Sequence, residues 1–422
     1  MKRHDVSAVE RVRQTRRLIE REGTAGVVRR VRARGAKLVA PPTSAPLPVA
    51  REDLVGAARV LATGNPLPGP APVLPGDPLR VAWVDVPPSK GSGGQTTIYR
   101  MIEHLERHGV QCTMYLMDHH GWELETHRRT IATWWPGVRA EVRDLADGID
   151  DAHVVMATCW ESAYPVLASP ALGTRMYFVQ DYEPMFYPAG SLAMLAEATY
   201  DFGFRAITAG RWLSERMARD HGLVADHFDF GCDLTHYNLD TSAGAGQRRT
   251  GVAYYCRPST PRRAHELALV ALEVFAEQHP EVPIHLYGEA VTGLGFEATH
   301  HGLLTPQALG ELYNTCIAGL ALSATNVSLV PHEMLGAGCI PVVNDGEHTR
   351  LVLDNDHVAY APPSPFGLAS ALGRLVRASE DERTARAAAA SASVVSRSWE
   401  SAGDQVLAAI RSAVASYAAG VG

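Results

Sequence analysis

The hydrophobic positions of the chain follow two alternating patterns. Short apolar runs such as residues 154–157 are typical of strands that are buried on both faces of a parallel sheet. Between these runs, segments such as residues 95–108 repeat apolar residues every three or four positions, which predicts a helix with one buried face. Strands that alternate with helices in this way favour βαβ units and parallel sheets.

Two successive sets of such units are expected. The predicted strands are residues 80–85, 110–117, 154–157, 175–179 and 206–209 in the first set, and residues 251–255, 284–288, 320–322 and 339–343 in the second. The predicted helices are residues 95–108, 264–278, 332–337, 385–392 and 399–417. We therefore predict an α/β protein with two doubly wound, Rossmann-like domains.

Composition sets the expected domain boundaries. Ten of the 27 prolines lie between residues 41 and 78, which predicts an extended linker around a short helix at residues 50–63. A stretch rich in Ser, Gly and Ala at residues 241–249 predicts a hinge. The expected parts are a basic helical extension with its Pro-rich linker (1–79), a first Rossmann-like domain (80–247), a second Rossmann-like domain (248–395) and a C-terminal helix (396–422).

Charge is spread unevenly along the chain. The formal net charge is −7, yet residues 1–40 hold twelve Lys and Arg and four acidic residues, so this segment carries +8 and the remainder −15. A thin apolar stripe surrounded by arginines predicts a basic amphipathic helix, which would lie on an anionic membrane surface, pack on the body of the protein or make an oligomer contact. Nucleic acid is not expected as a partner, because no aromatic residues interleave with these arginines.

Length and hydropathy exclude several classes of protein. With 422 residues, 46% of them hydrophobic, the chain can form two domains with buried cores, which excludes a disordered protein. It has no apolar run of the ~18 residues that a membrane span needs. Its basic N-terminus lacks the apolar core of a signal peptide. We therefore expect a cytoplasmic protein, peripheral at the inner face of the cell membrane if residues 1–40 bind lipid.

Metal-ligand patterns are weak. The six cysteines are scattered without CxxC spacing and are expected to be buried free thiols. His300 and His301 are adjacent, so their side chains are expected to point apart. Asp354 and Asp356 flank a predicted turn. We therefore expect no metal site and no cofactor.

The stretch from Leu320 to Thr349 predicts a strand, a polar loop, a short helix and a strand. A loop that leads into a helix presents backbone N–H groups, here near Val327, Ser328 and Leu329, and these can hold a diphosphate. Glu333 follows on the helix, where its carboxylate can accept hydrogen bonds from the two hydroxyls of a ribose. A phosphate loop with an acid for ribose indicates a nucleotide ligand.

Arginines follow the first predicted strand of the second domain. Arg257 comes at the strand end and Arg262 at the start of the next helix, so both side chains can converge on one diphosphate. Arg263 is a less favoured substitute for Arg262. The alternative is that these are surface arginines that pair with Glu266 or with aspartates.

Polar residues also follow strands of the first predicted domain. Gly93 and Gly94 lie in the loop after the first strand, and Asp181 and Glu183 lie in the string FVQDYEPMFYP after a later one. Open α/β sheets bind ligands at such strand ends. Asp181 is a candidate for orienting an acceptor hydroxyl. For Glu183, just before a proline, loop capping is the favoured interpretation.

These strings resemble a known family. The segment SxxxxSLVPHEMLGAGCIPVVND is similar to the signature of retaining GT-B glycosyltransferases of family four, in which two glutamates are separated by seven residues. Glu333 matches the second glutamate, whereas Thr325 stands where the first would be. The strings YxRPxxxR and FVQDYEPxFYP resemble bacterial rhamnosyltransferases that build surface polysaccharides. The Arg257 and Arg262 pair resembles the family's Arg and Lys.

The resemblance implies a fold and a reaction. It implies two Rossmann-like domains facing across a cleft, an acceptor domain followed by a nucleotide-sugar domain, with the last helix returning to the first domain. It implies retaining, metal-independent transfer of a sugar, with dTDP-rhamnose as the favoured donor, to a hydroxyl of a free or lipid-linked saccharide. The sugar would lie by Thr325 and Asn326, facing Gly93, Gly94 and Asp181. Donor contacts are also implied at Gly288 and Leu304.

Two other functions remain open from the sequence. One is a nucleotide-sugar epimerase of similar architecture, although such enzymes need acids and histidines around the sugar, and the loop around Thr325 lacks them. The other is a non-catalytic scaffold that binds sugar nucleotides, which the threonine at position 325 makes conceivable.

Overall fold

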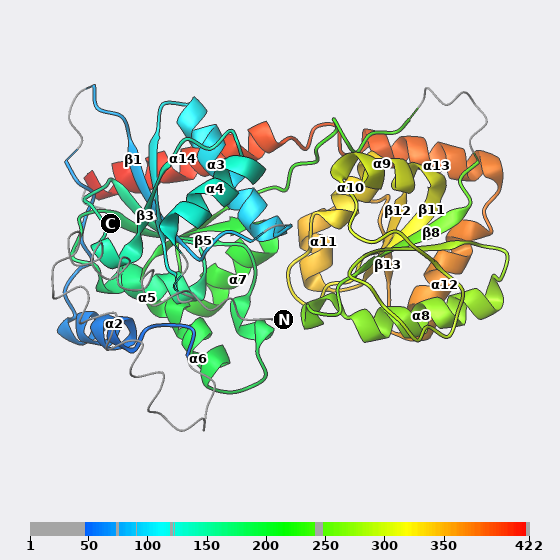
Figure 1. Ribbon diagram of the computed structural model, residues 1–422, viewed down its shortest axis with the longest axis horizontal. Helices are drawn as coiled ribbons and strands as arrows, with labels where there is room; N and C mark the ends of the chain where they lie inside the picture. Colours follow the sequence, from blue (N-terminus) through cyan, green and yellow to red (C-terminus); the bar gives the residue numbers. More distant parts are fainter. Residues whose placement is uncertain are drawn as a thin grey trace, which may run out of the picture. The chain divides into compact units, whose positions relative to one another are not determined.

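Figure 1 shows the computed structural model of the chain, in which two parallel sheets follow one another along the sequence. The structure describes residues 47–72, 76–89, 91–118, 121, 123–240 and 248–418. The basic segment at residues 1–40 lies outside the described residues, as does most of the linker at residues 241–249. What the sequence predicts for these two segments stays a prediction.

The first sheet contains seven parallel strands in the order β3-β2-β1-β4-β5-β6-β7. Its strands are β1 (Arg80–Asp85), β2 (Gln111–Leu116), β3 (Glu141–Asp144), β4 (Val154–Ala157), β5 (Thr174–Val179), β6 (Arg205–Ala209) and β7 (Ala225–Phe228). The central strands are buried along most of their length, as the apolar runs predict.

The second sheet contains six parallel strands in the order β10-β9-β8-β11-β12-β13. Its strands are β8 (Gly251–Cys256), β9 (Ile284–Gly288), β10 (Thr299–His300), β11 (Cys316–Leu320), β12 (Ile340–Asn344) and β13 (Ala359–Ala361). In both sheets the strand order reverses beside the first strand, which is β1 in one and β8 in the other.

Helices lie on both sides of each sheet (Figure 1). In the first domain they are α2 (Arg51–Thr63), α3 (Gly93–Arg107), α4 (Leu124–Trp134), α5 (Trp160–Ala168), α6 (Ser191–Ala198) and α7 (Arg211–His221). After β8 they are α8 (His265–Gln278), α9 (Pro306–Thr315), α10 (Val330–Gly336), α11 (Glu347–Leu353), α12 (Pro365–Val376), α13 (Glu380–Ala392) and α14 (Trp399–Ala418). The prediction of two doubly wound α/β domains is confirmed.

Two predicted elements around the polar loop are displaced. The strand expected at residues 320–322 is wrong, because the small apolar residues before it already form β11, which is buried throughout between β8 and β12. The short helix begins two residues earlier than expected, at Val330, since Pro331 occupies its first turn, where a missing N–H has no consequence. Gly338 follows the helix with a φ of 73°, as predicted for a residue that ends it.

Part of the segment assigned to the extension and linker packs on the first domain. The helix α2, expected at residues 50–63, lies against α5, and its Ala57 is 1% exposed. Further along, the Ala71 N–H donates to the Ala152 carbonyl, and the Gly173 N–H donates to the Gly69 carbonyl. Residues 49–72 thus contact the first domain through α2 and through backbone hydrogen bonds.

The two connections between the domains are joined by a backbone hydrogen bond. The Cys232 N–H, in the outgoing connection, donates to the Arg397 carbonyl, in the returning one, at 2.9 Å. Gly231 leaves no room for a side chain, because a Cβ there would lie 2.5 Å from the Trp399 nitrogen. From Trp399 onward α14 packs on α3 and on strands of the first sheet.

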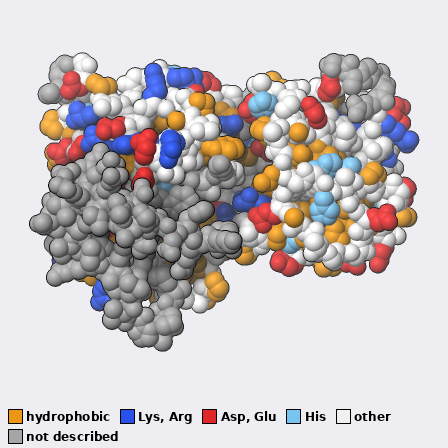
Figure 2. Space-filling view, in the orientation of Figure 1, with side chains coloured by type: hydrophobic (Ala, Val, Ile, Leu, Met, Phe, Trp, Pro, Cys, Tyr) orange, Lys and Arg blue, Asp and Glu red, His pale blue; other side chains and the backbone are white. Residues whose placement is uncertain are grey.

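The surface of the described part carries both signs of charge. On the face shown in Figure 2, Lys and Arg side chains are interspersed with Asp and Glu. No helix within the described ranges is both long and apolar enough to cross a bilayer.

Candidate functional site

Most of the residues that the sequence singled out follow the ends of four strands. In the first domain, the loops after β1 and β5 hold the glycine turn and Asp181. In the second domain, the loops after β8 and β11 hold the arginines and the polar loop at residues 321–329. β1 and β8 are the strands beside which the strand order reverses, and open α/β sheets bind their ligands outside such strand ends.

Asp181 connects the first domain to the polar loop of the second. Its carboxylate accepts hydrogen bonds from Thr325 Oγ1 at 3.0 Å and from the Asn326 N–H at 2.8 Å. It also forms an ion pair with Arg262 at 3.3 Å. Asp181 is therefore a residue that positions the polar loop, and its role at an acceptor hydroxyl stays a prediction.

Asn326 reinforces this connection from the second domain. Its side chain is fully buried, and its amide donates to the Gln180 carbonyl at 2.9 Å and to the Ala209 carbonyl at 2.8 Å. Its Oδ1 accepts the Val327 N–H at 3.0 Å. Thr325 and Asn326, which were predicted to lie beside a sugar, are thus bound to the first domain, and their contact with a sugar stays a prediction.

We expect Asn326→Ala to lower the free energy of unfolding by about 1–3 kcal/mol, because the Gln180 and Ala209 carbonyls would lose their buried donor. Urea unfolding measures this change. Asn238→Ala is the matched control, since that exposed amide donates only to the nearby Leu234 and Thr235 carbonyls, and its loss should change stability by less than about 0.5 kcal/mol. Equal effects of the two substitutions would contradict the structural role of Asn326.

The two arginines expected at a diphosphate lie at opposite ends of the loop after β8. Arg257 donates to the Tyr255 hydroxyl at 3.1 Å and forms an ion pair with Glu289, not Glu266, at 3.4 Å. Arg262 lies over the Phe186 ring at 4.2 Å, beside its ion pair with Asp181. Both side chains are about one-third exposed, although the Nε atom of Arg262 is buried.

Arg263 makes different contacts from Arg262. Its guanidinium donates to Ser323 Oγ at 2.8 Å and to the Asn326 carbonyl at 3.2 Å, which fixes the start of the polar loop. Burial lowers the pKa of Arg263 to about 10, with nearby Asp181 opposing that shift, so the group stays charged at neutral pH. Arg263 therefore supports the loop and adds positive charge beneath it.

The end of the polar loop presents backbone donors. Within the described residues, no protein acceptor is bound by the N–H groups of Ser328 and Leu329, whereas the Val327 N–H is used by Asn326. Leu329 is the N-cap of α10, and its side chain makes no capping hydrogen bond. The N–H groups of Ser328 and Leu329 are thus available to an anion, and their contact with a diphosphate stays a prediction.

Glu333 lies on the first turns of α10, behind that loop, and is partly exposed. Burial raises the pKa of Glu333 to about 7, the Arg100 guanidinium opposes this rise and the Asp233 carboxylate adds to it. A carboxylate with few charged partners keeps its acceptor capacity for a ligand hydroxyl. This environment is compatible with the predicted contact to a ribose.

The glycine turn after β1 lies beside the strand end that carries Asp181. A Cβ on Gly94 would lie 3.5 Å from Gln180 Nε2, so this glycine is adjacent to the residue before Asp181. Gln95 fixes the preceding loop, because its amide donates to the Pro87 carbonyl and accepts the Ser89 N–H. Gly93 begins α3 and has open space at its Cβ position.

Gly288 and Leu304 lie at the neighbouring end of β9. Gly288 has a φ of 104°, and a Cβ there would lie 2.5 Å from the Cys256 carbonyl oxygen, so only glycine fits. Its N–H donates to the Gly302 carbonyl at 2.8 Å, which holds the segment before Leu304 against the strand end. Leu304 is partly buried. The donor contacts implied for these two residues stay predictions.

Glu183 has the capping role that the sequence favours. Its carboxylate accepts the Trp160 N–H at 2.6 Å and the Tyr177 hydroxyl at 2.9 Å. Burial, with Glu161 nearby, raises the pKa of Glu183 well above its ordinary range. Glu183 is therefore a buried structural acid.

A second buried acid in the first domain was missed by sequence reasoning. Asp85 is the last residue of β1, and its Oδ1 accepts the Thr158 hydroxyl at 2.8 Å and the Val86 N–H at 2.8 Å. Burial raises the pKa of Asp85 to about 6, although the Thr158 hydrogen bond opposes this. Its position at the end of the first strand was the available signal.

Comparison with known families and proteins gives two sequence matches. Residues 250–373 match a family model described as WsaF, C-terminal domain. Over 331 residues, 74% of this chain, the sequence is 33% identical to the O-antigen biosynthesis protein RfbC of Myxococcus xanthus. The matched region covers 25% of that protein, so the chain spans about a quarter of the length of this relative.

Solved structures resemble the fold at low sequence identity. The Anabaena protein Alr3699/HepE in complex with UDP-glucose superposes with a TM-score of 0.61 at 14% identity, covering 79% of this chain and 100% of that one. TarM superposes with a TM-score of 0.64 at 8% identity, covering 80% and 100%. A mutant of the O-GlcNAc transferase of Thermobaculum terrenum gives 0.54 at 12% identity, covering 88% and 76%. The predicted GT-B fold is thereby confirmed.

Proposed function

We propose that the chain is a glycosyltransferase that moves a sugar from a nucleoside diphosphate donor to a saccharide hydroxyl during the assembly of a surface polysaccharide. The observation that carries the proposal is that Arg257 and Arg262 lie in the loop after β8, while the open N–H groups of Ser328 and Leu329 lie in the loop after the neighbouring strand β11. Such fixed positive groups stabilise the negative charge that develops on a diphosphate leaving group. The GT-B fold, the O-antigen relative and a neighbour with bound UDP-glucose support this interpretation.

The donor would be held from three sides. Arg257 and Arg262 would contact the diphosphate, with Arg263 adding charge beneath, and Glu333 would accept hydrogen bonds from the ribose. The sugar would then lie toward Thr325. Three guanidinium groups supply the charge that a metal ion supplies in other enzymes, which supports a metal-independent reaction.

The threonine at position 325 does not leave the sugar end of the site without an acid. The resemblance places a glutamate there, but Thr325 Oγ1 donates to Asp181, which brings a carboxylate of the first domain to within 3.0 Å of the same place. Asp181 would stand in for the absent side chain. This geometry favours an enzyme over a silent scaffold.

Rhamnose, transferred from dTDP-rhamnose with retained configuration, is the finer form of the proposal. It rests on the strings at residues 178–188 and 255–262 and on the relative in O-antigen biosynthesis. The acceptor would be a free or lipid-linked saccharide.

A thermal-shift screen across dTDP-, UDP- and GDP-sugars tests the donor. We expect dTDP-rhamnose to raise the unfolding temperature most, because at equal concentrations the ligand with the lowest Kd stabilises the folded state most. A ligand at 100 times its Kd stabilises the folded state by about 2.7 kcal/mol. Product analysis of the best donor, with and without saccharide acceptor, then tests the reaction. Transfer or slow donor hydrolysis is expected. An epimerised nucleotide sugar, or binding without either reaction, would contradict the proposal.

A further inference from the structure

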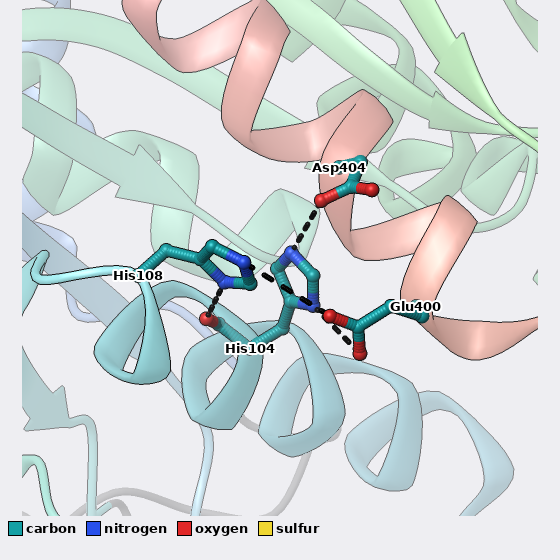
Figure 3. A group of neighbouring side chains, drawn as sticks. All are labelled: His104, His108, Glu400 and Asp404. Atoms are coloured by element: carbon teal, nitrogen blue, oxygen red, sulfur yellow. Dashed lines mark hydrogen bonds and ion pairs between the residues drawn. The ribbon is translucent and has the colours of Figure 1, made fainter.

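Two pairs of side chains meet where α14 crosses α3, away from the loops that hold Arg257 and Arg262. His104 lies on α3, and His108, four residues later, is the residue that directly follows this helix. Glu400 and Asp404 are four residues apart on α14. This spacing places each pair on one side of its helix. Figure 3 shows the four side chains gathered between the two helices. One possible ligand atom from each lies within 4.8 Å of those of the other three.

We propose that this cluster is a zinc site that fastens α14 to α3, with His104 Nδ1, His108 Nε2 and the Glu400 carboxylate as protein ligands and Asp404 as the residue that orients His104. Imidazole and carboxylate form a donor set that zinc accepts. Three protein ligands leave a fourth position for water.

The ligand atoms of the cluster lie somewhat farther apart than in an occupied site. Glu400 oxygens lie 3.5 Å from His104 Nδ1 and 4.0 Å from His108 Nε2. Zinc bonds of ~2.0–2.2 Å at tetrahedral angles place ligand atoms about 3.4 Å apart. Small rotations of exposed side chains are therefore enough to complete the site.

Hydrogen bonds select the ring nitrogens that face the ion. His108 Nδ1 lies 2.9 Å from the His104 carbonyl, which can only accept, so the hydrogen sits on Nδ1 and Nε2 keeps its lone pair. His104 Nε2 lies 3.1 Å from Asp404, and a hydrogen shared there leaves Nδ1 unprotonated toward Glu400. A carboxylate or carbonyl behind each imidazole is the arrangement found around zinc-binding histidines.

The cluster is rigid on one side and open on the other. His104 is 1% exposed and packs directly on Gly403 of α14, where a Cβ would clash with the imidazole ring. The side chains of His108 and Glu400 are 38% and 52% exposed. An ion can thus enter from solvent toward a ring that is already fixed.

One neighbouring charge opposes the ion. Arg107 Nη2 lies 3.0 Å from a Glu400 oxygen and 3.5 Å from His104 Nδ1. This guanidinium occupies the cation side of Glu400, but its side chain is half exposed and can turn to solvent. Zinc would replace it, because a metal ion bonds to the Glu400 carboxylate and to both imidazole nitrogens at once, whereas the guanidinium makes only hydrogen bonds.

Calorimetric titration of the full-length protein, stripped of metal with a chelator, tests the site. We expect one equivalent of zinc chloride to bind, and magnesium or calcium, which prefer all-oxygen sites, to give no signal. His108→Ala and Glu400→Gln should weaken zinc binding by at least ~100-fold, and Asp404→Asn by about 10- to 100-fold. Arg107→Ala should strengthen it by ~3-fold or more, because a like charge is removed.

Controls separate a lost ligand from a damaged protein. His300→Ala removes an exposed histidine elsewhere and should leave zinc binding unchanged. Zinc should raise the unfolding temperature of the wild type and of His300→Ala but not that of His108→Ala, while the three should unfold at similar temperatures without zinc. Absence of zinc binding to the wild type, or wild-type binding by both His108→Ala and Glu400→Gln, would overturn the proposal.

Discussion

Arg257→Ala and Arg262→Ala should each weaken the binding of a nucleoside diphosphate by about 10- to 100-fold. Each substitution removes a charge-assisted hydrogen bond to phosphate, which contributes about 1.5–3 kcal/mol. Calorimetry with the free nucleoside diphosphate at fixed ionic strength measures the loss without depending on the sugar. Arg262→Ala should also lower stability slightly, since it ends the ion pair with Asp181, whereas Arg257 faces Glu289 within its own domain.

Arg350→Ala is the matched control for these arginines. Arg350 belongs to the same domain, forms an exposed ion pair with Asp345 at 2.5 Å and lies over the Tyr360 ring. It contacts none of the loops at the candidate site, so its loss should leave nucleotide affinity unchanged. Wild-type affinity in both Arg257→Ala and Arg262→Ala would show that the phosphate lies elsewhere.

Glu333→Gln should weaken nucleotide binding by about 1.5–3 kcal/mol and, at alkaline pH, stabilise the unliganded protein. The pKa of Glu333 is raised from 4.5 to about 7 by burial, so the folded state resists ionisation. Below about pH 4.5 the acid is neutral in both states and has no effect. Stability is lost as the pH rises from about 4.5 through 7. Glutamine removes this loss, so the variant should be more stable than the wild type by about 1–3 kcal/mol at pH 8.

Denaturant unfolding at pH 4 and pH 8 and nucleotide titration from pH 6 to pH 8 check these two effects together. Wild-type affinity should rise across that range as the Glu333 carboxylate ionises, and the affinity of the variant should stay flat. Glu347→Gln, an exposed acid on α11, should change neither quantity. A variant that is more stable at pH 8 yet binds nucleotide as wild type would leave Glu333 a partly buried acid without a ligand role.

The fold could be predicted from the sequence because the strands of both sheets are buried on two faces. Their apolar runs therefore stand out, and the ranges expected for β1, β4 and β9 agree with the structure. The strand expected at residues 320–322 was displaced from its true position at β11 (Cys316–Leu320). The small residues of β11 give little hydrophobic pattern, and they follow directly on α9. The packing of α2 on α5 could not be predicted, since the surrounding prolines indicated an extended linker and nothing local marks its partner.

The sequence suggests which residues form the candidate site but not the contacts between them. Arginines and a glutamate near strand ends indicate a nucleotide, because chemistry and position along the chain suffice for that inference. The bonds from Asp181 to Thr325 and Asn326 join residues about 145 positions apart, and nothing local records them. His104 and Glu400 were missed for the same reason, since each histidine or acid pair alone is a common feature of an exposed helix face.

The contact between α3 and α14 at Gly403 should be detectable by mutagenesis. Gly403 has no side chain and lies far along the sequence from Arg257 and Glu333. A search for functional side chains would therefore predict that its substitution has no effect. Yet the His104 imidazole occupies the space where its Cβ would be. A saturation mutagenesis screen should therefore find that position 403 does not tolerate substitution, because α3 and α14 pack too closely there for a side chain.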